Sequence, residues 1–117
     1  MRDHKKLRAF ELVDQLAVAV YRHAAEFPRD EVFGLTSRTR RAAVSVVSNI
    51  VEGCARNSQS DYFRFLDMAY GSVRELEYQV SLAERLRYFK DAAPLSSLAS
   101  ETGKVLNGLI RSLRRPE

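Results

Sequence analysis

The sequence holds few of the residues that disulfide-bonded or membrane-spanning proteins need. Its 117 residues include one cysteine, Cys54, which excludes an internal disulfide and fits a reducing cytoplasm. No stretch approaches the roughly 18 consecutive apolar residues of a membrane span. The charged opening, residues 1–6, is not followed by the apolar core of a secretory signal. We therefore expect a cytoplasmic protein without a membrane partner.

Residues that could catalyse a reaction or hold a metal are equally scarce. The two histidines, His4 and His23, lie at opposite ends of the first predicted helix. A metal site needs clustered His, Cys or carboxylate ligands, and a di-iron bundle needs paired Glu-x-x-His motifs. We predict no catalytic residue, no metal and no cofactor, and hence that the protein is not an enzyme. A small nuclease is disfavoured because no acid–base constellation is recognisable.

What the sequence does contain is helical periodicity. Apolar residues recur three or four positions apart in four segments, at about residues 7–26, 36–55, 59–88 and 94–115, without β-strand alternation. The strongest pattern is a heptad rhythm in the third segment, carried by Tyr62, Leu66, Ala69, Val73, Leu76, Val80 and Ala83. Short connections favour antiparallel neighbours. The predicted fold is therefore all-α, an up-down-up-down antiparallel four-helix bundle that occupies residues 1–117 as one domain.

Side-chain hydroxyls mark where two of these helices should begin. Thr36 or Ser37 follows the break at Gly34 and is expected to cap the second helix. Ser58, with an acid three residues later at Asp61, resembles the capping-box pattern at the start of the third.

Two of the predicted helices carry apolar residues on more than one face. These residues are Phe63, Phe65 and Tyr70 in the third helix, and Leu12, Leu16 and Val18 in the first. A helix that is apolar around more than one face needs more than one neighbour. We therefore expect self-association, with scattered surface aromatics as the alternative interpretation.

The segment 43–56 is apolar yet contains four polar side chains, Ser45, Ser48, Asn49 and Glu52, which we name the polar seam. Helical spacing places Ser45, Ser48 and Glu52 on one stripe, with Asn49 at its edge. Buried polar groups need partners, because an unsatisfied one costs about 1–3 kcal/mol. A structural role at a close helix contact, or at a subunit contact, is therefore favoured over a reactive site.

The polar seam also leads to specific expectations about its partners. Asn49 and Glu52 are predicted to bond across a helix contact to Arg74, Tyr78 or a backbone group. Small side chains in the seam, and Gly71 on the third helix, are predicted to let neighbouring helices approach closely.

Positive charge dominates one end of the predicted bundle. The chain has a net charge of +4 and a pI near 9.5, which makes an anionic partner plausible. The end where the first and third helices begin, which we name the basic pole, gathers Arg2, Lys5, Lys6, Arg8, Arg56, Arg64, Arg111, Arg114 and Arg115. The opposite end mixes basic and acidic residues. Arg38, Arg40 and Arg41 lie there near a helix start, where the helix dipole disfavours cations.

These charges define the candidate nucleic-acid-binding residues. They are Lys5, Lys6, Arg8, Arg38, Arg40, Arg41, Arg56, Arg111, Arg114 and Arg115. No basic patch alternates with exposed aromatic residues along the sequence, so binding is expected to follow phosphates, with little base stacking. A solvated basic surface without a partner is the alternative.

One stretch carries a resemblance to a known family. RRAAVSVVSNIVEG, residues 40–53, resembles the signature of the four-helix-bundle proteins encoded in intervening sequences of bacterial 23S ribosomal RNA genes. Further matches are FP with EVFGLT at residues 27–36, GSVRELE at 71–77 and LNGLI at 106–110. Val47 stands where the family pattern has proline, so a straighter second helix is expected.

The resemblance also carries functional implications. That family is similar to the accessory variability determinant of diversity-generating retroelements, a basic pentamer that works with a reverse transcriptase and nucleic acid. The resemblance therefore implies a homopentamer that binds RNA or DNA. The alternative is an adaptor that docks on a reverse transcriptase, or on another nucleic-acid enzyme, without binding nucleic acid directly.

Overall fold

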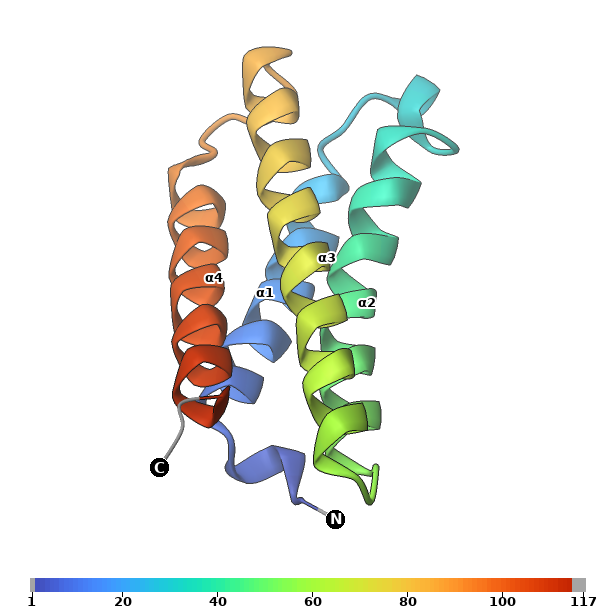
Figure 1. The fold of residues 1–117 in the computed structure, drawn as a ribbon. Helices are drawn as coiled ribbons and strands as arrows, with labels where there is room; N and C mark the ends of the chain where they lie inside the picture. Colours follow the sequence, from blue (N-terminus) through green and yellow to red (C-terminus); the bar gives the residue numbers. More distant parts are fainter. Residues whose placement is uncertain (1, 115–117) are drawn as a thin grey trace.

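The protein is described here by a computed structural model of residues 2–114, except for the side chain of Lys6. Four α-helices make up most of the chain (Figure 1): α1 Arg8–Ala24, α2 Leu35–Cys54, α3 Gln59–Arg85 and α4 Ala93–Arg114. Two 3₁₀ turns, η1 His4–Lys6 and η2 Arg29–Glu31, precede α1 and α2. The described residues contain no β-strand, which confirms the prediction of an all-α, four-helix chain.

The helices form an elongated bundle that measures 48 × 22 × 19 Å. The connections alternate between its two ends, so each helix lies beside the next one in the chain (Figure 1). α2 and α3 share the most extensive contact, and α1 also packs against α4. No helix within residues 2–114 is long and apolar enough to cross a membrane.

The helix ends show one confirmed cap and one wrong prediction. Ser58 caps α3 as expected, because its Oγ accepts from the backbone N–H of Asp61 at 3.1 Å. At α2 the predicted hydroxyl cap is wrong. The helix begins at Leu35, whose N–H donates to Glu31 Oε1 at 3.1 Å, and Thr36 is buried inside the first turn. α2 continues without interruption through Val47.

The heptad positions of α3 form its buried face, as predicted. All seven are at most 2% exposed, from Tyr62 to Ala83. The predicted second apolar face was partly wrong, because Leu12, Leu16 and Phe65 are buried within this one chain. Val18 is 47% exposed. Burial inside the bundle therefore accounts for several residues that the sequence assigned to a subunit contact.

Close helix approach depends on glycines other than the predicted one. A methyl group on Gly53 of α2 would lie 2.8 Å from Cβ of Phe65 on α3, closer than real contacts allow. Gly71 is exposed, and a methyl group there would meet no atom within 4 Å. The prediction for Gly71 is therefore wrong, because this residue faces away from the heptad stripe.

Candidate nucleic-acid interface

The three arginines near the start of α2 do not act as one group. Arg40 is half-buried, its guanidinium lies 4.9 Å from the centre of the Tyr21 ring, and its NH2 group donates to the Tyr21 carbonyl at 2.9 Å. Arg38 and Arg41 are exposed on another face of the helix. A helix turns about 100° per residue, so Arg38 and Arg41 lie about 60° from each other, whereas Arg40 lies about 100° or more from either.

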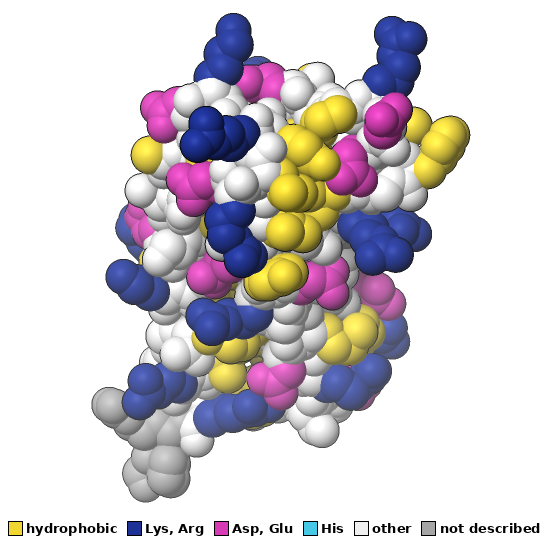
Figure 2. All heavy atoms as spheres, turned by 90° about the horizontal axis from the view of Figure 1, so that it is seen from above, with side chains coloured by type: hydrophobic (Ala, Val, Ile, Leu, Met, Phe, Trp, Pro, Cys, Tyr) yellow, Lys and Arg dark blue, Asp and Glu magenta, His cyan; other side chains and the backbone are white. Residues whose placement is uncertain are grey.

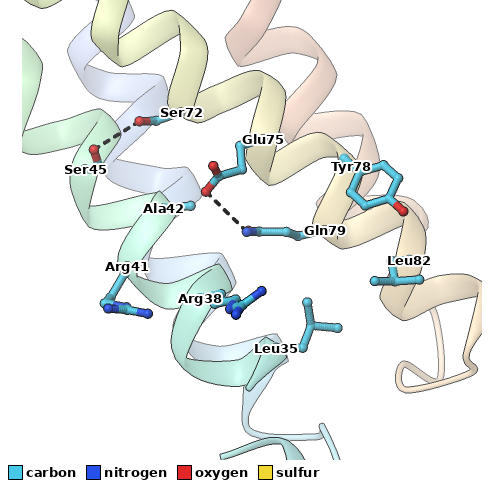
Figure 3. Close-up of a pocket in the computed structure, with 10 residues that line it drawn as sticks. All are labelled: Leu35, Arg38, Arg41, Ala42, Ser45, Ser72, Glu75, Tyr78, Gln79 and Leu82. Carbon is cyan, nitrogen blue, oxygen red and sulfur yellow. Dashed lines mark hydrogen bonds between the residues drawn. The ribbon is translucent and has the colours of Figure 1, made fainter. Parts of the chain in front are cut away.

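Arg38 and Arg41 line a groove of about 710 Å³ between α2 and α3. Its walls, which we name the α2/α3 groove, are Leu35, Arg38, Arg41, Ala42 and Ser45 of α2 with Ser72, Glu75, Tyr78, Gln79 and Leu82 of α3. Figure 3 shows Arg38 and Gln79 extending into the space between the helices. A hydrogen bond of 3.0 Å between the hydroxyls of Ser45 and Ser72 spans the helices at one end of the groove.

The two walls of the α2/α3 groove differ in charge. Neither Arg38 nor Arg41 has a carboxylate within 4.0 Å among the described residues. On the α3 wall, Glu75 accepts a hydrogen bond from Gln79 Nε2 at 3.3 Å. Gln79 is 8% exposed, and its Oε1 is buried without a hydrogen-bond partner in the described structure. The groove is therefore cationic along α2 and anionic along α3.

The predicted basic pole is organised differently, because most of its arginines have partners. Arg8 pairs with Glu101 at 3.6 Å and Arg56 with Glu52 at 2.7 Å. Arg114 pairs with Asp67 and lies over the Phe63 ring, 5.3 Å from its centre. Exposed ion pairs contribute only about 0–1 kcal/mol. A phosphate could displace these carboxylates, but it would have to compete with them.

Two candidate cations at the basic pole are without an ion pair among the described residues. Lys5 is exposed, and only its backbone N–H is bonded, to Asp3 Oδ1 at 3.0 Å. Arg111 is exposed and lines a second groove of about 480 Å³ between α3 and α4, together with Arg114 and Tyr70. The Lys6 side chain and Arg115 lie outside the described residues.

Seen from above, the opposite end of the bundle has mixed charge. Figure 2 shows Lys and Arg side chains interspersed with Asp and Glu around a strip of hydrophobic side chains. This view agrees with the mixed charge predicted for that end. Phe33, in the connection between α1 and α2, is 96% exposed.

Aromatic rings accompany the arginines more closely than the sequence suggested. Tyr78 is 60% exposed on the α3 wall of the groove, and the Arg85 guanidinium lies 5.7 Å from its ring centre. The order of residues did not reveal this arrangement, because Tyr78 of α3 lines the same groove as Arg38 and Arg41 of α2.

The polar seam bonds mainly within α2. Asn49 Nδ2 donates to the Ser45 carbonyl at 2.9 Å and to Ser45 Oγ at 3.1 Å. Glu52 pairs with Arg56 one turn later, and Ser48 is exposed. The predicted cross-helix bonds of Asn49 and Glu52 are therefore replaced by local ones in this chain. Ser45, through Ser72, makes the contact between helices.

Two further groups that could react, the thiol of Cys54 and the carboxylate of Glu31, are buried or hydrogen-bonded within the fold. Burial raises the pKa of the Cys54 thiol, which disfavours the reactive thiolate. The backbone N–H of Leu35 and the Tyr88 hydroxyl, which donates to Glu31 Oε2 at 2.8 Å, lower the pKa of Glu31. Among residues 2–114, no three His, Cys, Asp or Glu side chains are grouped so that they could hold a metal ion.

By its four helices and its net charge of +4, the protein is a small, basic four-helix bundle. The sequence profile of the 23S rRNA-intervening sequence protein family matches residues 5–108, and the chain belongs to that family. Comparison with curated proteins finds no match.

A solved structure supports the same fold. It is a crystal structure of a protein with unknown function from the S23 ribosomal protein family of Bacteroides thetaiotaomicron. The similarity has a TM-score of 0.78 at 21% identity and covers 88% of this chain and 98% of the other. At this identity the likeness concerns the fold alone.

Proposed function

We propose that the protein is a non-enzymatic, cytoplasmic homo-oligomer that binds RNA or DNA through backbone phosphates. Each subunit is an up-down-up-down antiparallel bundle, in keeping with the alternating connections in Figure 1. The resemblance to the retroelement determinant favours five subunits.

One observation carries the nucleic-acid proposal. Lys5, Arg38, Arg41 and Arg111 are exposed, and none forms an ion pair among the described residues. A phosphate that binds such a side chain displaces condensed counterions and does not have to break a protein ion pair. The net charge of +4 acts in the same direction by attracting polyanions.

Exposed apolar side chains on α1 and α2 support self-association. Val18 and Tyr21 of α1 are 47% and 46% exposed, and Val44 of α2 is 43% exposed. Arg40 lies against Tyr21, and Val44 follows Arg40 by one helical turn. Because the two helices run in opposite directions, we infer that Val44 and Val18 lie at a similar level along the bundle. Several subunits would then bring several cationic sites together, which raises avidity.

The nucleic-acid proposal is tested by the salt dependence of binding. Fluorescence anisotropy with a labelled duplex measures the affinity at several salt concentrations. The logarithm of the affinity should fall linearly with the logarithm of the salt concentration, and each lost phosphate contact should make this slope shallower by about 0.9. The double variant Lys5→Ala/Arg111→Ala should lose more affinity and slope than Arg8→Ala/Arg114→Ala, which removes the same charge from ion-paired positions. Equal losses in the two variants would show that only net charge matters. A parent protein that binds nothing at about 50 mM salt would refute the proposal.

The alternative is an adaptor for a reverse transcriptase or another nucleic-acid enzyme, and one exposed side chain favours it. Phe33 is 96% exposed, beside Val32 at 47%, where a protein partner could cover both. Under this alternative, Phe33→Ser abolishes binding to the enzyme, and the isolated parent binds no nucleic acid.

A further inference from the structure

We propose that the α2/α3 groove is a subsite for one unpaired nucleotide of a single strand. Its phosphate would contact Arg38 and Arg41, and its base would stack on Tyr78. This inference rests on the proposed nucleic-acid binding and narrows it to single-stranded RNA or DNA at this groove.

The size and exposure of the groove suit such a ligand. Its volume of about 710 Å³ lies within the roughly 300–1,000 Å³ of small-molecule sites. Tyr78 is 60% exposed, so its ring can receive a base. Aromatic rings bind single strands because every unstacked base offers a flat face, whereas the bases of a duplex are already stacked.

Arg38 and Arg41 can receive the phosphate on the opposite wall. They lie three residues apart on α2, and no described carboxylate lies within ion-pair distance of either. A guanidinium presents several N–H donors in a plane, which matches the geometry of phosphate oxygens. Two such groups one turn apart can hold the backbone of a strand that runs along α2.

Glu75 determines which wall of the groove the phosphate avoids. Its carboxylate repels phosphate from the α3 wall and accepts hydrogen bonds from amino groups on a base edge, such as N4 of cytosine. Gln79 Nε2 donates to it at 3.3 Å and restrains its position. Gln79 itself is buried, with Oε1 unpartnered, and residues that break such a rule are good functional candidates. The charge difference between the walls thus places the phosphate on α2 and the base on α3.

The test compares a labelled ten-nucleotide single-stranded RNA with a duplex of the same sequence by fluorescence anisotropy. Tyr78→Ala should weaken single-strand binding by roughly 5- to 20-fold, as expected for the loss of one stacked base, and duplex binding by less than about 2-fold. Tyr78→Phe keeps the ring and should bind like the parent. Met68→Ala is the control, because Met68 is 46% exposed on the same helix, α3, outside the groove. Arg38→Gln/Arg41→Gln should also weaken single-strand binding.

The outcomes separate this inference from the proposed function. If the parent binds both nucleic acids and Tyr78→Ala weakens neither, or weakens both equally, the groove inference is wrong and the general proposal stands. If the parent binds neither nucleic acid, both fail. If Tyr78→Ala keeps RNA binding but loses a protein partner that copurifies with the parent, the groove is a protein-docking site and the inference is wrong. Circular dichroism should show parental helicity in each variant, because the substituted side chains are exposed.

Discussion

The two ends of the α2–α3 contact differ in how closely the helices approach. Near Gly53 the helices are so close that a single added methyl group would meet Cβ of Phe65 at 2.8 Å. Toward the start of α2 the same pair separates around the α2/α3 groove of about 710 Å³. Glycine at the closed end lacks the Cβ atom that would keep the helices apart, whereas the exposed Arg38 and Arg41 line the open end. One pair of helices thus provides both a tight structural contact and a site open to a ligand.

The largest expected effect concerns the closed end. Gly53→Ala should lower the free energy of unfolding by about 1–3 kcal/mol, since the new methyl group overpacks against Cβ of Phe65 on α3. Gly71→Ala is the matched control on the exposed face of α3 and should stabilise the protein by up to about 1 kcal/mol through helix propensity. Urea denaturation measures both variants. A Gly53→Ala protein as stable as the parent would show that the closed end is not tightly packed.

An intermediate effect is expected where the closed and open ends meet. The hydroxyls of Ser45 and Ser72 bond at 3.0 Å between α2 and α3. A double-mutant cycle with Ser45→Ala and Ser72→Ala should give a coupling free energy of about 0.5–1.5 kcal/mol. Ser48→Ala, on the exposed side of α2, serves as the control and should show no coupling with Ser72→Ala. Additive effects of Ser45→Ala and Ser72→Ala would mean that the hydroxyl bond does not link the helices.

The smallest effect is expected at the far side of the open end, where Glu31 accepts from Leu35 N–H and from the Tyr88 hydroxyl. These bonds lower the pKa of Glu31 below its ordinary 4.5, so the ionised form stabilises the fold above pH 4.5. That contribution is lost as the pH falls below 4.5 and through the pKa of the folded state. Parent and Glu31→Gln should therefore differ in Tm at pH 7 and converge in acid. A difference that does not change with pH would contradict this account.

Local regularities made much of the fold predictable, although two local features, the orientation of Gly71 and the cap of α2, were predicted wrongly. The heptad pattern correctly predicted the buried face of α3, because the spacing of residues within a helix decides which of them share a face. Gly71 was assigned to a close contact although it lies two residues from Ala69 and Val73, where the helix turns it outward. The α2 cap was missed because Glu31 reaches Leu35 from a separate 3₁₀ turn.

The candidate site was less predictable than the fold. The sequence could have shown that Arg40 lies on a different face of α2 from Arg38 and Arg41, because each residue turns the helix by about 100°. No local pattern shows that Asp67 neutralises Arg114, since these residues are 47 positions apart. The position of Tyr78 opposite Arg38 likewise depends on how α3 packs against α2. The sequence therefore showed which residues are cationic. It did not show which of them are free of ion pairs and so available to a ligand.

The central claim is that the open end of the α2–α3 pair receives an unpaired base, and photocrosslinking tests it directly. Single-stranded RNA containing 4-thiouridine would be irradiated with the parent protein and the digested complex analysed by mass spectrometry. Trypsin releases Tyr78 in the peptide of residues 75–85, and Phe63 of the basic pole in the peptide of residues 57–64. We expect the crosslink on Tyr78 and its loss at high salt. A crosslink confined to residues 57–64, or to any peptide outside α2 and α3, would contradict the claim.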